Sequence, residues 1–302
     1  MRILIVGAGA TGGSYGTLLL EAGRDVTFLV RPQRAEVLRR DGLRFVTPEA
    51  DRTHQVQPLI SGEEAAPFDL VLLTVKATAL ESAIADMRSY IGPRTRIVPI
   101  LNGMAHIPRL ELEFPGQVLG GLAKIVATLD GGAVHQMTGL TALTIGMLDG
   151  SQMPSEIVQV LDVPGIDLTV SDDVTAALWE KWAFIAAAGV ITCLFRGPVG
   201  AIIEAGGLAR INDAIDEMEE VAAAAGYPVS EQGHRHSLDL LTAPGSAFTS
   251  SLYRDLTAGF PHEGEHILGA MVERARQLDV QTPLLDLTVI QVRTGAIAKA
   301  RY

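Results

Sequence analysis

The opening segment carries the feature that most limits what this chain can fold into. "RILIVG" is a continuous apolar run typical of a strand buried on both faces, and "ATGGSYGTLLLEAG" then follows helical spacing. Between them, Gly7, Gly9 and Gly12 form the pattern G-x-G-x-x-G. A strand, a glycine turn and a helix in this order predict the first unit of a doubly wound, Rossmann-type α/β domain.

The three glycines have separate mechanical tasks in such a unit. One makes a tight turn, one lets a pyrophosphate approach the backbone, and one allows the helix to pack closely on the strand. The start of the helix, at Ala10 and Thr11, then offers free N–H groups to phosphates. We therefore expect a dinucleotide site here, with a glycine-rich strand end that binds nothing as the alternative.

Arg31 indicates which dinucleotide is bound. A site that prefers NAD usually has an acidic residue about 20 residues after the glycines, where it holds the ribose hydroxyl. Here "DVTFLV" predicts the second strand, and Arg31 follows it directly. Because an arginine suits a 2′-phosphate, the predicted cofactor is NADP(H); the alternative is that Arg31 is a solvated loop charge.

Further strands and helices follow the opening unit. Residues 68–76, "FDLVLLTVK", and 95–103, "TRIVPILNG", predict two more strands with a helical pattern between them. Strands that alternate with helices indicate a parallel sheet. Residues 116–148 alternate in hydropathy and contain turn signals at "DGG" and "TG", so we expect hairpins at a sheet edge.

The sequence pattern changes after Asp172, from alternating strands and helices to helices alone. A helix over 151–165 and a strand over 166–173 complete the first layer, and helical patterns then continue almost to the end. We expect a Rossmann domain over 1–167 and an all-helical second domain over 168–302.

Composition excludes several classes of partner. The net charge is −11 and no basic run is present, which argues against a nucleic-acid or anionic-membrane partner. The single cysteine, Cys193, excludes an internal disulfide and suits a buried thiol in a reducing compartment. The apolar run before Gly7 is too short for a signal peptide, and no uncharged apolar stretch is long enough to span a membrane. We therefore expect a cytoplasmic protein, and the sequence leaves a homodimer open.

Lys181 lies at the head of an almost wholly apolar run within the stretch "ALWEKWAFIAAAGVITCLF". A charge in such surroundings costs several kcal/mol unless it is paired, hydrated or used. On a helix, Lys181 shares a face with residues that we expect to leave room for a ligand: Ile185, Ala188, Gly189 and Thr192. The alternative is a helix-end charge that pairs with a carboxylate or reaches water.

A series of motifs resembles one family. In chain order they are "GAGATGG", "VLLTVKA" with Lys76, "PILNGM" with Asn102, "LWEKWAF" with Lys181, and "SSLYRDL" followed by Glu263. Together they resemble the ketopantoate reductases (2-dehydropantoate 2-reductases) over nearly the whole chain. The resemblance implies NADPH-dependent reduction of a 2-keto acid, 2-dehydropantoate to pantoate in pantothenate and coenzyme A biosynthesis, or a related keto acid.

The resemblance also implies a role for each matched residue. Lys181 would be the general acid that protonates the ketone oxygen, and Glu263 would bind a substrate hydroxyl. Asn102 would contact both cofactor and substrate, Ser251 would hold the substrate carboxylate, and Lys76 would lie at the cofactor end of the cleft. The role of Lys181 agrees with the chemistry, because hydride delivery develops negative charge on the ketone oxygen. The plainer alternative for Glu263 is an acid that stabilises a helix N-terminus.

Two departures from the family pattern concern the substrate. Ile185 and Gly189 stand where the lysine helix of the family usually carries asparagines, and "HEGE" replaces the usual "TEID". Polar contacts between an enzyme and its substrate have a strong effect on which substrate the enzyme accepts. The fold and the reaction type are expected to survive these changes, whereas the keto acid itself is left open.

Two rival functions stay open. "HEGEH", from His262 to His266, matches the H-E-x-x-H pattern of zinc hydrolases, although Gly264 weakens a helix there. The second rival is a protein that senses NADP(H) without chemistry. A sensor would not need all four of the predicted site residues, and the presence of Lys181, Asn102, Ser251 and Glu263 therefore argues against this second alternative.

Overall fold

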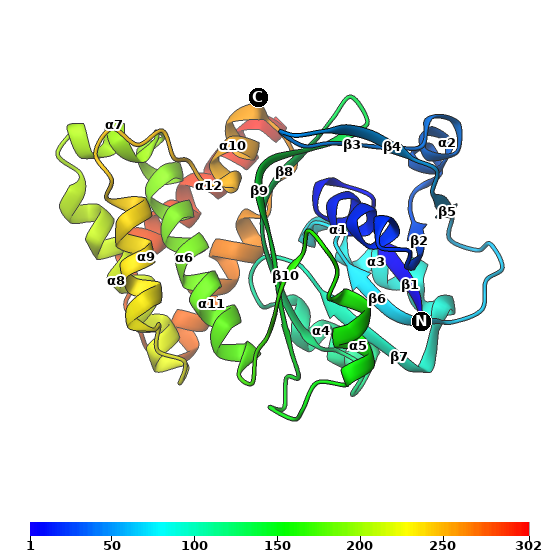
Figure 1. The fold of residues 1–302 in the computed structure, drawn as a ribbon. Helices are drawn as coiled ribbons and strands as arrows, with labels where there is room; N and C mark the ends of the chain where they lie inside the picture. The colour runs from blue at the N-terminus through cyan, green and yellow to red at the C-terminus, as the bar shows by residue number, and fades with distance from the viewer. Residues whose placement is uncertain (302) are drawn as a thin grey trace. The chain divides into compact units, whose positions relative to one another are not determined.

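The computed structural model describes the backbone of residues 1–301 and the side chains of residues 1–298. Its contacts divide the chain into two compact units, drawn in Figure 1. The first unit contains Met1–Leu101 and His106–Val174, and the second contains Asn102–Ala105 and the chain from Thr175 onward. The short segment Asn102–Ala105 therefore packs with residues that follow it by more than seventy positions in sequence. Residue 302, the end of the expected helical domain, lies outside the described residues.

A five-stranded parallel sheet forms the centre of the first unit, with the strand order β5-β2-β1-β6-β7. Its strands are β1 (Arg2–Val6), β2 (Asp25–Leu29), β5 (Gln57–Leu59), β6 (Phe68–Leu73) and β7 (Ile91–Pro99). The doubly wound parallel sheet expected from the sequence is confirmed. Strand β1 lies between β2 and β6, so the glycine turn that follows β1 is at the middle of the carboxyl edge.

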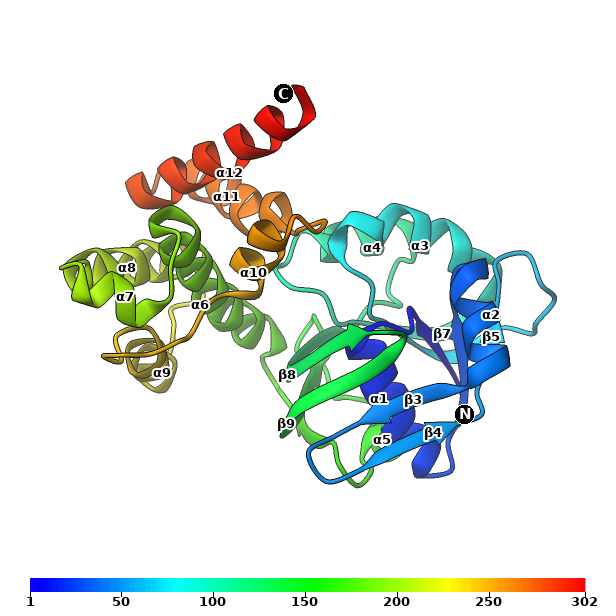
Figure 2. The same ribbon diagram turned by 90° about the horizontal axis from the view of Figure 1, so that it is seen from above.

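Both faces of this sheet are buried, which explains the continuous apolar runs. Along β1, Ile3 and Ile5 join one hydrophobic cluster, and Leu4 and Val6 join another on the opposite face. Figure 2 shows α1 on one side of the sheet and α3 and α4 on the other. The helices of this layer are α1 (Ala10–Glu21), α2 (Pro32–Asp41), α3 (Leu80–Met87), α4 (His106–Glu113) and α5 (Ser155–Leu161).

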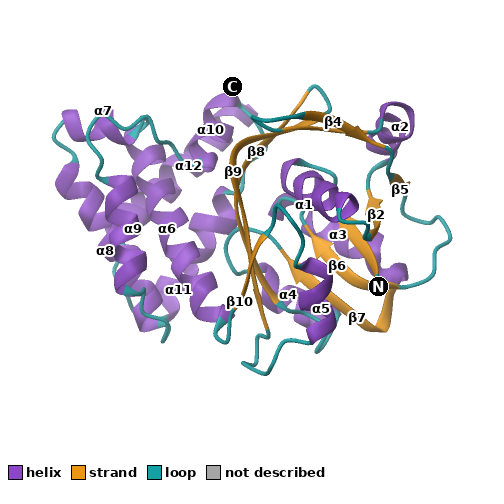
Figure 3. Ribbon diagram, in the orientation of Figure 1, coloured by secondary structure: helices purple, strands orange, loops and turns teal. Residues whose placement is uncertain are grey.

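A second sheet belongs to the same unit. The strands are β3 (Leu43–Val46), β4 (Asp51–His54), β8 (Gly120–Asp130), β9 (Ala133–Gly146) and β10 (Asp167–Val170). The order is β10-β9-β3-β4, and β8 pairs with β9. The alternating segment forms a hairpin, as expected, and most of it belongs to this second sheet, visible in Figure 3, while Val118 forms a bridge to Ile97 in β7, the edge strand of the first sheet. Its inward residues Val134, Leu143 and Ile145 are fully buried in the cluster that also contains α1 residues.

Two glycines allow the hairpin to turn tightly. Gly131 and Gly132 have φ values of +54° and +85°, and they connect the directly paired residues Asp130 and Ala133. A two-residue hairpin turn with both central residues at positive φ matches the twist of the strands it joins. The turn signal read from "DGG" is therefore confirmed.

Helix α1 is held between the two sheets. An added Cβ at Gly13 would lie 2.5 Å from Cγ2 of Val134 in β9, so only glycine permits this approach. The Tyr15 hydroxyl is fully buried with its ring and donates to the Ala142 carbonyl at 2.7 Å. The close packing and the hydrogen bond both fix the helix that carries the glycine loop against β9 of the second sheet.

The second unit is helical in its described part. Its elements are α6 (Val174–Phe195), α7 (Val199–Glu204), α8 (Leu208–Ala224), α9 (Glu231–Leu241), α10 (Ser251–Ala258), a π-helical turn (Glu265–Gly269), α11 (Ala270–Gln277) and α12 (Pro283–Arg301). Helix α6 is long and apolar enough to cross a membrane, but most of that stretch is buried among the other helices. It is therefore the core helix of this unit. Cys193 on α6 is 1% exposed, and burial raises the pKa of its thiol to about 12.

Replacing Tyr15 with Phe should lower the free energy of unfolding by about 1 kcal/mol, because a net hydrogen bond is lost while the apolar packing stays. Urea denaturation followed by circular dichroism measures this change. An unchanged midpoint would show that the hydroxyl does not help to hold α1 against β9.

Candidate active site

The glycine loop has the geometry that a dinucleotide site requires. Gly7 adopts φ +99°, and its N–H donates to the Leu29 carbonyl at the end of β2 at 3.0 Å. A Cβ on Gly12 would lie 2.0 Å from the Gly7 carbonyl oxygen, so Gly12 is required for packing. A Cβ on Gly9, the N-cap of α1, would meet nothing within 4 Å. Open space at a helix N-terminus without acidic residues in its first turn fits a pyrophosphate.

Thr74 supports this loop and was not found from the sequence. It follows β6, and its hydroxyl lies 3.0 Å from the Val6 carbonyl oxygen and 2.9 Å from that of Gly7. A hydroxyl beside a glycine loop has no sequence signal of its own, because it depends on β6 lying next to β1. Lys76 comes two residues later, is exposed, and precedes a short 3-10 turn. Lys76 and the glycine loop therefore follow the carboxyl ends of neighbouring strands, where open α/β sheets bind ligands.

Arg31 and Arg34 have different roles in the first unit. Arg31 is the exposed N-cap of α2, directly after β2. Arg34 donates from Nη1 to the Gly132 carbonyl at 2.9 Å, and burial lowers the pKa of its guanidinium. Arg34 thus ties α2 to the β8–β9 turn, while Arg31 is presented to solvent beside the strand that neighbours β1. Such a cation fits the 2′-phosphate of NADP(H), and the residues present therefore fit the whole cofactor.

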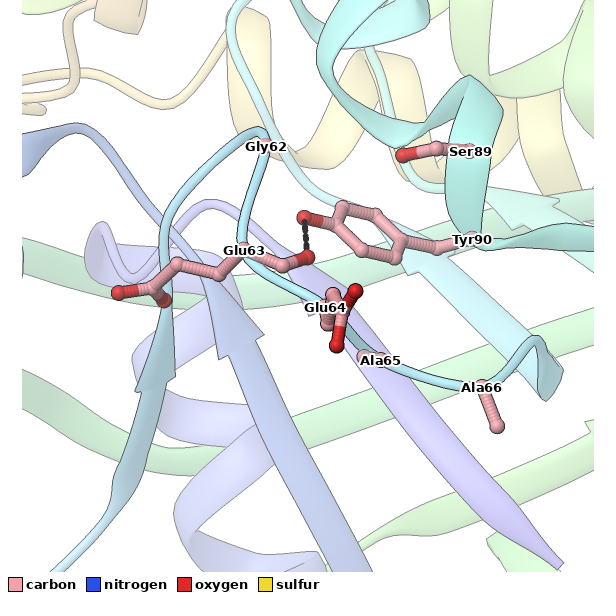
Figure 4. A pocket seen from close by; sticks show the side chains of 7 residues that line it. All are labelled: Gly62, Glu63, Glu64, Ala65, Ala66, Ser89 and Tyr90. Carbon is pink, nitrogen blue, oxygen red and sulfur yellow. Dashed lines mark hydrogen bonds between the residues drawn. The ribbon is translucent and has the colours of Figure 1, made fainter.

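A surface hollow of the first unit lies elsewhere. Figure 4 shows that it is lined by residues 62–66, Ser89 and Tyr90. The Tyr90 hydroxyl lies 2.9 Å from the Glu63 carbonyl oxygen. These residues precede β6 and β7, whereas the glycine loop follows the carboxyl end of β1. We therefore do not assign the cofactor to this hollow.

In the second unit, the structure brings together two predicted site residues that are far apart in sequence. The Asn102 side-chain amide donates from Nδ2 to Oε2 of Glu263 at 3.3 Å, and both residues are half-buried. The Glu263 carbonyl accepts the N–H of Ile267 at 2.9 Å, which fixes the backbone behind the carboxylate. The result is a carboxylate with one amide partner at the start of the π-helical turn.

His266 joins the same group. Burial lowers the pKa of its imidazole, while Glu263 and a hydrogen bond to the Asn102 backbone oppose that shift. Burial thus favours the neutral form of this ring over the charged form, compared with a histidine in water. A π-helical turn inside a helix is common at functional sites, and this one begins two residues after Glu263.

A glycine and a tryptophan hold the segment of Asn102 against this turn. Gly103 adopts φ +77°, and a Cβ there would lie 3.1 Å from the His266 carbonyl oxygen. The Trp182 indole donates from Nε1 to the Ile267 carbonyl at 2.9 Å. Three segments, 102–105, α6 and 263–269, are therefore fastened to one another within the second unit.

Lys181 directly precedes Trp182 on α6 and is half-buried. The helix begins at Val174, so Lys181 lies about two turns inside it rather than at its head. The expectation that small residues on its face leave room for a ligand is wrong at Gly189. A Cβ there would lie 3.2 Å from Cδ2 of Leu268 and 3.5 Å from Cδ2 of Leu252, so packing fills that space.

Two adjacent serines at α10 differ in their surroundings. Ser250 is buried, caps the helix by accepting the Tyr253 N–H at 3.0 Å, and lies 2.7 Å from the hydroxyl of Thr192. Ser251, the residue that the family resemblance selected, is exposed on the first turn. Ser250 therefore has a structural task, and the substrate role of Ser251 stays a prediction.

The H-E-x-x-H pattern does not adopt the helix that the zinc reading needs. His262 lies before the helical turn, and its Nδ1 accepts the Gly264 N–H at 3.3 Å. Glu265 forms an ion pair with Arg293 at 2.6 Å. Among the side chains of residues 1–298, no three or more histidines, cysteines or acids are grouped to hold a metal ion.

A parallel sheet with this glycine loop, together with a helical unit that holds an Asn–Glu pair, defines a Rossmann-type oxidoreductase. Two family models match the chain: "Ketopantoate reductase PanE/ApbA" over residues 3–150 and "Ketopantoate reductase PanE/ApbA C terminal" over residues 173–295. The chain therefore belongs to the ketopantoate reductase family. Members of this family are NADP-dependent oxidoreductases that act on CH–OH groups, so both the enzyme class and the cofactor expected from the sequence are confirmed.

The structural neighbours share the fold of this chain and include enzymes with different names. An "Uncharacterized oxidoreductase YkpB" from Bacillus subtilis is 34% identical, and the match covers 95% of this chain and 96% of that protein. A PanE/ApbA family ketopantoate reductase from Ralstonia eutropha has a TM-score of 0.90 at 25% identity, with full coverage of both chains. A D-mandelate dehydrogenase with NADH and anilino(oxo)acetate has a TM-score of 0.89 at 21% identity, covering 99% of each chain.

Two alanine variants should separate the structural glycine from the binding glycine. Gly12→Ala should destabilise the protein by about 1–3 kcal/mol, because its methyl group meets a main-chain oxygen. Gly9→Ala should leave stability nearly unchanged, since its φ of −85° suits alanine and the space is open. It should weaken NADPH binding by about tenfold or more, about 1.4 kcal/mol, because the methyl group stands where the pyrophosphate must approach.

Thermal unfolding and calorimetric titration with NADPH measure the two effects. Unchanged NADPH affinity in Gly9→Ala would contradict the assignment of the glycine loop.

Proposed function

We propose that the enzyme uses NADPH to reduce a 2-keto acid to a 2-hydroxy acid, with 2-dehydropantoate as the first candidate and other branched or hydroxylated keto acids next. The observation that carries this proposal is the hydrogen bond between Asn102 and Glu263, in the same unit as Lys181. A carboxylate held by an amide, with a lysine on a core helix of that unit, suits recognition and protonation of a hydroxylated keto acid.

Each residue then has a defined chemical task. Bound NADPH supplies the hydride that is added to the keto carbon. The Lys181 ammonium donates the proton that the ketone oxygen acquires, and the cation stabilises the negative charge that develops on this oxygen. Glu263 accepts a hydrogen bond from a substrate hydroxyl, and Asn102 keeps this carboxylate oriented. The exposed hydroxyl of Ser251 donates to the substrate carboxylate.

Features of the second unit bear on which keto acid is used. Gly189 packs against two leucines, and Ile185 is half-buried, so neither position supplies an amide to a polar substrate. The structural likeness to a D-mandelate dehydrogenase supports including keto acids with bulky apolar groups. We propose to compare 2-dehydropantoate, 2-ketoisovalerate and phenylglyoxylate by the loss of NADPH absorbance. No turnover with any keto acid would favour the NADP(H)-sensing alternative.

Cellular setting and assembly stay proposals as well. We propose that the enzyme acts in the cytoplasm on a small-molecule substrate, because its single cysteine is a buried free thiol, which suits a reducing compartment. A homodimer is proposed on the commonness of twofold assemblies, and sedimentation of the purified protein tests it.

Replacing Lys181 with Ala should lower kcat by about 10²–10⁴-fold, the range expected when a general acid is lost. The matched control is Lys124→Ala, which removes an exposed lysine from β8 and should leave kcat unchanged. Steady-state kinetics with the best keto acid measure both variants. Near-normal turnover of Lys181→Ala would remove this residue from the mechanism.

Replacing Arg31 with Asp should move the cofactor preference from NADPH toward NADH by about tenfold or more, because a charge-assisted hydrogen bond contributes about 1.5–3 kcal/mol. The control Arg40→Asp changes an exposed arginine later in α2 that pairs with Asp41. Dissociation constants for NADPH and NADH give the preference. If the preference for NADPH over NADH stays unchanged, a residue other than Arg31 binds the 2′-phosphate.

A further inference from the structure

His266 has no role in the reaction scheme above, yet it contacts the residues that do. Its imidazole hydrogen-bonds the backbone of Asn102, and its ring lies close enough to Glu263 for their charges to interact. Its carbonyl oxygen and ring both pack against Gly103, with 3.1 Å and 3.4 Å from the position of an added Cβ. His266 therefore contacts the segment 102–105 through both its main chain and its side chain.

The segment 102–105 needs such a contact to hold the Asn102 side chain in place. It is a short stretch without regular helix or strand, and Gly103 allows it to bend through a positive φ. The Asn102 amide reaches Glu263 at 3.3 Å, which is near the limit of a hydrogen bond, so a small shift of the backbone breaks it. The direction of the Asn102 backbone thus decides whether the amide meets the carboxylate.

A half-buried histidine is suited to this task. One ring nitrogen donates to the Asn102 backbone, and this hydrogen bond fixes the tautomer and the orientation of the ring. The main chain on either side is fixed as well, because Trp182 donates to the carbonyl of Ile267 at 2.9 Å. The ring is therefore a rigid link between the core helix α6 and the segment that carries Asn102.

We propose that His266 is a positioning residue of the substrate site: by holding the backbone of Asn102, it keeps the Asn102 amide on the Glu263 carboxylate and so sets the direction in which that carboxylate meets a substrate hydroxyl. The part that concerns the substrate rests on the function proposed above. The part that concerns Asn102 and Glu263 rests on the geometry of the second unit alone.

Substitutions at His266 test the proposal by kinetics. His266→Phe keeps a ring of similar size without a donor, and it should raise the KM for the keto acid about five- to tenfold, which corresponds to one lost hydrogen bond. The dissociation constant for NADPH should change less than twofold. His266→Asn and His266→Gln retain a donor at the reach of one or the other ring nitrogen, and one of them should restore most of the KM. The control His236→Phe alters an exposed histidine that stacks on Phe184 and should change neither constant.

A double-mutant cycle shows whether His266 acts through Asn102. If it does, His266→Phe should have almost no further effect on kcat/KM once Asn102 is replaced with Ala. Fully additive effects of the two substitutions, or failure of both amide variants to restore the KM, would overturn the proposal. A fall in thermal stability without a change in KM would assign His266 a structural role only.

A substrate-free measurement separates this proposal from the proposed function. Nitrogen-15 NMR of the His266 ring should show one tautomer in the wild-type enzyme, and the Asn102 side-chain amide signals should shift in His266→Phe but not in His236→Phe. Unchanged Asn102 signals would overturn the positioning role. Should no keto acid be reduced while these signals behave as expected, the proposed function fails and the positioning role stands.

Discussion

The close approach of α1 to β1 is the constraint on which the first unit depends. No side chain fits between Gly12 and the carbonyl oxygen of Gly7, and the other side of the helix meets β9 at Gly13 with equally little space. The helix is thereby fixed between two sheets, with its N-terminus at the carboxyl edge of the parallel sheet. A phosphate-binding loop on so rigid a support keeps its geometry without contributions from charged side chains.

In the second unit, the main constraint is that a carboxylate must be held among apolar helices. Glu263 is half-buried, and a carboxylate removed from water needs hydrogen-bond partners in the protein. The Asn102 amide supplies one partner from a segment whose neighbours in sequence belong to the first unit. The four residues 102–105 therefore complete a candidate site whose other residues follow Val174 in the sequence.

Sequence periodicity was sufficient to predict the parallel sheet, the glycine loop and the change to helices, because all three follow from local burial patterns. It missed β3 and β4, since exposed residues in β4 leave no clear alternation and the pairing of β3 with β9 is long-range. The expected space beside Gly189 was wrong because the leucines that fill it come from other helices. Thr74 was not found, and His266 was noted only as part of the H-E-x-x-H pattern, for the same reason: their contacts depend on neighbours that only the folded chain supplies.

The burial of Cys193 has a practical consequence. It is the only cysteine in the sequence, its side chain is 1% exposed, and its pKa of about 12 leaves almost no thiolate at neutral pH. Oxidants and alkylating reagents act on the thiolate, so the folded enzyme resists both. The rate at which this sulfur is alkylated therefore reports how often the core of the helical unit opens, without any engineered label.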